Sequence, residues 1–210
     1  MRKIIFAVFS LLLLSSINVF GQDTNWKARF RIISVTPDES ATIQTIGGDV
    51  KIENVVVPEL DFTYYFSKNW AAELILATTN HDVSAIGTSA GDIALGDVWL
   101  LPPTLTFQYH LTSLKKFEPY FGAGINYTFF YNADAGSVAD NVSYDNSFGF
   151  ALQTGFDIDL NDKWFINADL KKIFLNTTAT VNATTVLGAT VDADVDINPL
   201  ILGIGFGMRF

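Results

Sequence analysis

The sequence predicts an all-β protein, an eight-stranded antiparallel transmembrane up-and-down β-barrel with short periplasmic turns and four long extracellular loops. Along the final stretch from Leu200 to Phe210, one face is wholly apolar and the other is mostly glycine. This period of two predicts a strand between lipid and a crowded interior. Short and long connections also alternate along the chain, as in small outer-membrane barrels. Beyond the N-terminal leader no window approaches 18 apolar residues, so strands and not helices are expected to cross the membrane.

Residues 1–21 have the features of a secretory signal peptide, and residues 22–210 are the expected barrel. Arg2 and Lys3 precede an apolar run from Ile4 to Leu14, and small residues precede Gln22. The chain has no cysteine, which excludes disulfides and thiol chemistry. Without the two leader cations, 11 basic residues face 22 acidic ones, so nucleic acid is not an expected partner.

Alternation defines the strands in chain order. In the first, Trp26, Phe30 and Ile32 alternate with cations, and in the second Pro58 removes one ladder hydrogen bond. The expected strands are 26–33, 55–66, 70–78, 101–110, 119–129, 148–160, 164–174 and 200–210. The expected long loops are the polar segments 36–54, 80–98, 132–147 and 176–196. Two interfacial aromatic belts are expected, one of Trp26, Tyr65, Phe66, Trp70, Trp164 and Phe210, the other of Trp99, Phe129, Tyr131, Phe148 and Phe174.

The inward residues nearer the short turns are predominantly charged. We expect them to form paired ions that plug the lower lumen, because eight strands leave an interior barely wide enough for their own side chains. This expected plug comprises Lys27, Arg29, Arg31, Glu59, Asp61, Glu73, Asp157, Asp159, Asp169, Lys171 and Arg209. The glycines of the last strand supply the room that the cations of the first strand need.

The inward residues of the outer half are aliphatic. They predict a cup that prefers apolar solutes, lined by Ile33, Val55, Val57, Ala77, Ile173 and Ile201. The alternative is that these side chains only fill a small lumen.

Motifs for chemistry are weak. Asp192, Asp194 and Asp196 have the spacing that begins a calcium loop, but Ile197 and Gly203 stand where that loop needs Gly and Glu. A loose divalent-cation or lipopolysaccharide-bridging site is left open, beside a solvated loop edge. His81 and His110 lack a Ser or Asp constellation, so we expect no enzyme, and the sequence indicates no metal site or cofactor.

Several runs resemble the OmpW family of outer-membrane proteins. These are AELILA at 72–77 followed by His81, LPPTL at 101–105, FEPYFGAGINYTFF at 117–130, WFINADLKKI at 164–173 and DINPLILGIGFGMRF at 196–210. The resemblance implies an eight-stranded barrel with a hydrophobic lumen that passes small apolar molecules across the outer membrane, with release sideways into lipid as one route. Phe148 stands where the family often has Trp, and the first two long loops match poorly.

The expected function is therefore diffusion of small hydrophobic molecules across the bacterial outer membrane, with both termini periplasmic. The alternative is a structural or adhesive barrel whose lumen is plugged and whose acidic loops bind a surface ligand or act as a receptor. Expected partners are outer-membrane lipid and lipopolysaccharide, small hydrophobic solutes, and the barrel-assembly machinery, which would engage the terminal Phe210.

Overall fold

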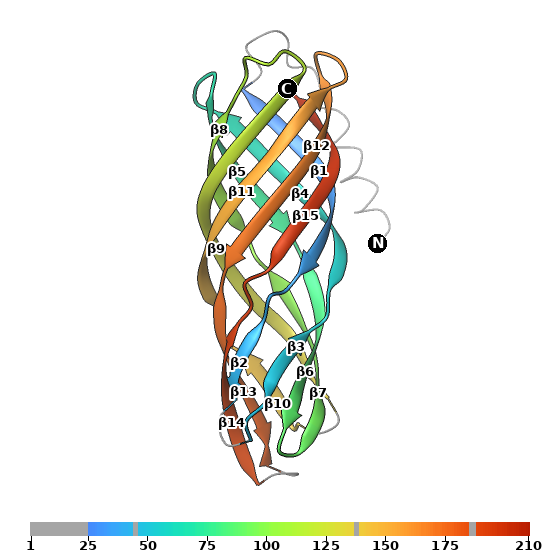
Figure 1. Ribbon diagram of the computed structural model, residues 1–210, viewed down its shortest axis with the longest axis vertical. Helices are drawn as coiled ribbons and strands as arrows, with labels where there is room; N and C mark the ends of the chain where they lie inside the picture. The colour runs from blue at the N-terminus through green and yellow to red at the C-terminus, as the bar shows by residue number, and fades with distance from the viewer. Residues whose placement is uncertain (1–24, 44–45, 137–138, 185–187) are drawn as a thin grey trace, which may run out of the picture.

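A computed structural model describes residues 25–43, 46–136, 139–184 and 188–210, so the expected signal peptide lies outside the described residues. The chain forms a long tube of tilted strands (Figure 1). Eight antiparallel strands close into a barrel in the order β11-β12-β15-β1-β4-β5-β8-β9, with β9 pairing back to β11. Their bounds are β1 (Trp26–Thr36), β4 (Val55–Tyr65), β5 (Trp70–Ala77), β8 (Thr104–His110), β9 (Phe117–Ala135), β11 (Ser147–Asp159), β12 (Trp164–Phe174) and β15 (Leu200–Arg209). The predicted eight-stranded barrel is confirmed.

Closure between β1 and β15 depends on small residues. Arg29 lies opposite Gly207 and Arg31 opposite Gly205, as the alternation predicts. A Cβ added at Gly205 would lie 2.0 Å from the Phe30 carbonyl oxygen, so only glycine allows the two backbones to pair at this distance.

The four long polar segments, which were predicted to be loops, instead contain β-strands. Beyond the barrel rim the strands continue as an extension of two sheets, seen at the lower end of Figure 1. One sheet continues β9 through β7 (Gly91–Leu101), β6 (Thr79–Thr88) and β3 (Asp49–Ile52); the other contains β10 (Asn141–Tyr144), β13 (Asn176–Ala183), β14 (Ala189–Asp196) and β2 (Ser40–Ile43). Small apolar residues alternate with Thr, Ser and Asp in these strands, so their inward face carries little hydrophobic signal in the sequence.

The edges of β2 and β3 meet at a seam between the two sheets. Side chains cross this seam, since the Ala41 amide donates to Asp49 Oδ1 at 2.6 Å and the Ile52 amide donates to Glu39 Oε1 at 3.0 Å. Two carboxylates therefore satisfy backbone donors that would otherwise be left at sheet edges.

The outer face of the barrel is apolar. Leu60, Phe107, Ile125 and Ile204 are each about half exposed, as expected of side chains that meet hydrocarbon instead of water. Tyr65 is an exception to the predicted belts, because its hydroxyl turns inward and donates to Glu118 at 2.7 Å. In the described part of the chain, no helix has the length and apolarity needed to cross a membrane.

In the described part of the chain, strand pairing in the barrel wall is interrupted beside two prolines. Pairing of β5 with β8 ends at Ile75 and Thr104, and pairing of β6 with β7 begins at Thr79 and Leu100. Pro102 and Pro103 lie between, and neither has an amide proton to donate to a neighbouring strand.

Candidate functional site: an apolar cavity above a charged layer

A layer of buried ions fills the barrel on the side of the short turns. Arg29 lies near its centre, with Nη1 2.9 Å from Asp61 Oδ1 and 3.1 Å from Glu73 Oε1, and with Nη2 3.1 Å from Asp157 Oδ2. The same Nη1 donates to the Thr63 hydroxyl at 2.6 Å. All these side chains are excluded from solvent, so each charge depends on its partners to offset the cost of desolvation.

Arg31 lies one step nearer the extension. Its guanidinium reaches Glu59 at 2.7 Å and Glu73 at 2.8 Å, and its Nε donates to Asn167 Oδ1 at 2.6 Å. Lys171 bridges Glu59 at 2.8 Å and Asp169 at 2.9 Å. Glu59 and Lys171 thus form the upper surface of the charged layer.

Near the short turns the layer reaches the barrel rim. Lys27 Nζ lies 2.7 Å from Glu118 and 2.9 Å from Asp157, and Arg209 lies 2.7 Å from Asp159. Every residue that the sequence assigned to the plug therefore lies inside the barrel in one connected set of ion pairs.

Uncharged side chains that the sequence analysis did not assign to the plug complete this layer. Tyr120 and Phe165 are fully buried, and the Arg29 guanidinium carbon lies 5.5 and 5.4 Å from their ring centres. Gln108 and Gln153 each donate to Glu73, at 2.6 and 2.7 Å. The alternation along their strands places all four side chains on the inward face, and this is the signal by which the sequence indicates them.

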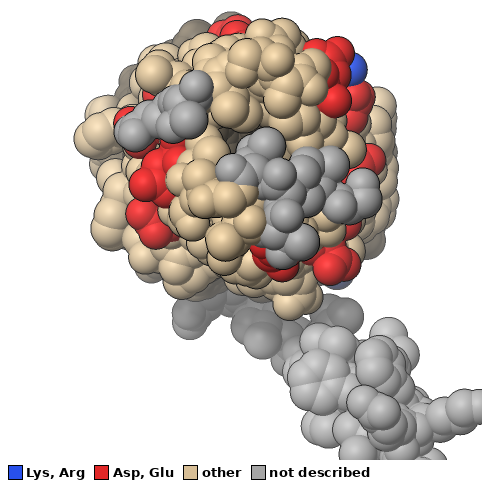
Figure 2. Space-filling model, turned by 90° about the horizontal axis from the view of Figure 1, so that it is seen from below, with Lys and Arg blue, Asp and Glu red and all other residues tan. Residues whose placement is uncertain are grey.

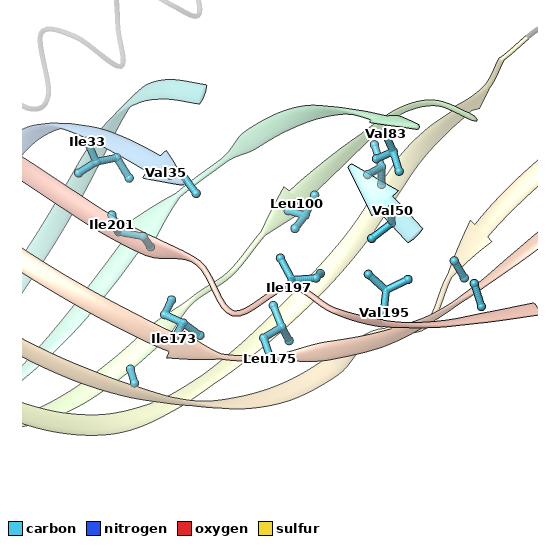
Figure 3. Packing of buried hydrophobic residues seen from close by; sticks show 14 residues of the cluster. Ile33, Val35, Val50, Val83, Leu100, Ile173, Leu175, Val195, Ile197 and Ile201 are labelled. Carbon is cyan, nitrogen blue, oxygen red and sulfur yellow. The ribbon is translucent and has the colours of Figure 1, made fainter. Parts of the chain in front are cut away.

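Above Glu59 and Lys171 lies a cavity of about 120 Å³. Its walls come from the outer barrel and from both sheets of the extension, and most of their side chains are aliphatic. Figure 3 shows Ile33, Ile173 and Ile201 on barrel strands, and Val50, Val83 and Val195 farther out in the extension. A cavity near 150 Å³ with such a lining stays dry and holds one benzene molecule, so this one suits a small apolar guest.

The predicted lining residues divide into two groups. Ile33, Ala77, Ile173 and Ile201 border the cavity, and the three isoleucines are at most 6% exposed. Val55 and Val57 pack against the same apolar cluster but stay half-buried and do not border the cavity.

Most of the lining comes from the extension, which the sequence analysis missed. The additional buried lining residues include Val35, Val50, Val83, Val98, Leu100, Leu175, Val191, Val195 and Ile197.

The cavity also borders the interruption in the barrel wall. Ala77 and Pro102 both line it, while the adjacent Leu76 and Leu101 are exposed on the lipid face. At this short stretch the Thr78 hydroxyl donates to the Leu100 carbonyl at 3.1 Å and lies 2.6 Å from the Tyr131 hydroxyl.

The far end of the extension carries exposed aspartates, and Figure 2 shows acidic side chains around it. Asp192 and Asp194 accept hydrogen bonds from Thr180 at 2.9 Å and Thr178 at 3.2 Å. Within the described residues, no group of three or more His, Cys, Asp or Glu side chains is arranged to hold a metal ion.

This architecture agrees with one family of known proteins. The model of the OmpW family matches residues 23–210. The chain belongs to the OmpW family. It is therefore an outer-membrane barrel, in agreement with the resemblance of its sequence runs.

Relatives of this OmpW-family chain cover most or all of its length. Outer-membrane protein y4mB of Sinorhizobium fredii is 41% identical over 88% of this chain and 80% of its own. Outer membrane protein W of Vibrio cholerae is 33% identical over the full length of both. A protein of Pseudomonas aeruginosa named dibenzothiophene metabolism operon protein PahQ is 31% identical over all of this chain and 99% of its own.

A solved structure supports the same assignment. The crystal structure of OprG from Pseudomonas aeruginosa is similar with a TM-score of 0.82 and 32% identity, covering 88% of this chain and 95% of that one.

Proposed function

We propose that this OmpW-family barrel collects small apolar solutes in its cavity and gives them a diffusive route past the polar lipopolysaccharide layer, without chemistry. The extension faces the exterior in this proposal, and both termini face the periplasm. Lipopolysaccharide surrounds the outer rim, and the exposed Phe210 is where the barrel-assembly machinery would engage the chain.

The lining of the cavity carries this proposal. An apolar guest gains free energy on leaving water for an aliphatic wall, whereas an ion or sugar would lose its hydration there. The relative named for dibenzothiophene metabolism supports the same solute class, because dibenzothiophene is an apolar aromatic compound.

The charged layer determines which exit from the cavity we propose for the solute. Glu59 and Lys171 pair at the cavity floor, and below them Arg29 and Arg31 are fully buried among carboxylates. An apolar solute passing straight down would have to part these ion pairs, which is costly in a low dielectric. The wall interruption at Pro102 and Pro103 leads instead toward the lipid-facing side, so we propose release into the bilayer.

The experiment compares a charge inside the cavity with one outside. Ile173→Asp places a carboxylate in the lining, while Thr190→Asp adds the same charge on the exposed face of β14. In vesicles with lipopolysaccharide in the outer leaflet, the wild type and Thr190→Asp should accelerate entry of radiolabelled toluene, and Ile173→Asp should not. Equal entry for all three proteins would contradict the proposal. No acceleration by the wild type would favour a plugged structural or adhesive barrel.

A further inference from the structure

Two neighbouring side chains in the cavity wall each present a polar atom for which the described residues offer no hydrogen-bond partner. His81 and Thr79 lie two residues apart on the inward face of β6, both are 4% exposed, and both border the cavity. Among the described residues, no side-chain hydrogen bond is found for His81 Nε2 or for the Thr79 hydroxyl, and neither atom is among the fully buried atoms that lack a partner, so both reach the space of the cavity. Polar atoms inside proteins are nearly always hydrogen-bonded, so two neighbouring polar atoms that face an otherwise apolar cavity are suited to bind a polar group of a guest.

The backbone fixes which imidazole nitrogen is free. His81 Nδ1 lies 2.8 Å from the Glu53 carbonyl oxygen. A carbonyl can only accept, so Nδ1 carries the proton and a neutral ring presents Nε2 as an acceptor. Burial lowers the pKa of His81, against the raising effect of the Glu53 hydrogen bond, which favours this neutral form.

The other threonine hydroxyls in the wall are already occupied. The hydroxyls of Thr104, Thr128 and Thr177 donate to the Pro102 carbonyl, Asn126 Oδ1 and the Asp145 carbonyl at 3.0, 2.8 and 2.7 Å. They can satisfy themselves without a guest, unlike His81 and Thr79.

Tyr144 also borders the cavity, from β10 in the other sheet of the extension. Burial and the nearby Asp97 charge raise the pKa of Tyr144 to about 12, so its hydroxyl stays neutral. It provides a comparison for a hydroxyl at another place in the wall.

We propose that His81 makes the cavity selective for apolar molecules that carry a single hydroxyl group, such as phenols and small alcohols. The guest hydroxyl donates to His81 Nε2, and the Thr79 hydroxyl donates to the guest oxygen. Residues two apart on one strand face are separated by roughly 7 Å, which leaves room for one oxygen between their side-chain tips. This inference rests on the proposed function and narrows its solute class.

The test uses phenol and toluene, which differ by a hydroxyl in place of a methyl group. The full chain is prepared in lipid nanodiscs with ¹⁵N-labelled histidine, and partition into protein-free nanodiscs is subtracted. The sequence contains two histidines, so His110, buried in the charged layer, serves as an internal reference. Phenol should move the Nε2 resonance of His81 upfield and leave His110 unchanged, and toluene should bind without moving either.

Variants give a second readout. In His81→Asn the amide nitrogen can still donate to the Glu53 carbonyl, but the amide oxygen lies on a shorter side chain and does not replace Nε2 at its position in the cavity. The preference for phenol over toluene should therefore fall by about threefold to tenfold, the worth of one neutral hydrogen bond. Thr79→Val should lower the preference as well, and Tyr144→Phe should leave it unchanged.

If both compounds bind, Nε2 does not move and His81→Asn keeps the wild-type preference, the selectivity inference is overturned while the proposed function survives. Loss of preference in Tyr144→Phe alone would also overturn it. If neither compound binds, the proposed function fails with it.

Discussion

The charged layer predicts a large and position-dependent cost of losing a single cation. Arg29→Met keeps much of the side-chain volume but removes the partner of Asp61, Glu73 and Asp157, which lie 2.9 to 3.1 Å from the guanidinium. Breaking a buried ion network on one side costs about 3–5 kcal/mol, because the remaining charges stay desolvated. We expect the free energy of unfolding to fall by that amount.

Arg209→Met is the matched control at the barrel rim. The Arg209 side chain is 14% exposed, and its close partner Asp159 is 26% exposed, so water can solvate the carboxylate that is left behind. The expected loss is about 1 kcal/mol. Urea unfolding in lipid vesicles, followed by tryptophan fluorescence, measures both variants. A loss below about 1 kcal/mol for Arg29→Met, or equal losses for the two variants, would refute the view that a desolvated layer seals the lumen.

Three further predictions concern closure, the seam and pH. Gly205→Ala should lower the free energy of unfolding by about 3 kcal/mol, because the new Cβ meets a backbone oxygen. Gly203→Ala should lower it by about 1 kcal/mol, because its Cβ meets side chains at 3.0 Å and beyond. Refolding yield and urea unfolding compare the two variants, and equal effects would contradict the role of Gly205 in closing the barrel. Glu39→Ala should speed hydrogen exchange of the Ile52 amide about fivefold, whereas Glu39→Gln, which keeps the acceptor oxygen, should not. Unchanged exchange in both variants would show that the seam does not need the hydrogen bond from the Ile52 amide to Glu39. Burial lowers the pKa of His81, against the Asp82 and Glu39 charges, so the unfolded state binds a proton at His81 more readily than the folded state does. The extension should therefore lose stability as pH falls below about 6.5. Hydrogen exchange in β6, corrected for intrinsic rates, should speed up at low pH in the wild type but not in His81→Asn.

The barrel strands could be predicted because lipid imposes a simple rule on them. Every second residue from Leu200 to Phe206 is large and apolar on the outer face, so period and orientation follow directly from the sequence. The charged layer could be located for a related reason, since distance from a short turn fixes the height of an inward residue such as Arg29 or Asp157.

The extension could not be predicted in the same way. Its outer face meets water instead of lipid, and its inward residues are often small, so Ala179, Ala193 and Val191 alternate with Thr and Asp in a pattern that also suits a polar loop. Most of the cavity lining was missed for this reason. The role of His81 depends on the carbonyl of Glu53, which is 28 residues away in the chain, and no local pattern indicates that contact.

The most direct test of the account measures potassium conductance and toluene entry on the same vesicles with lipopolysaccharide in the outer leaflet. A cavity open to apolar solutes above a sealed charged layer predicts that the protein accelerates toluene entry while conductance stays at the level of protein-free vesicles. Conductance that rises in proportion to the amount of protein, or toluene entry that the protein does not change, would contradict it.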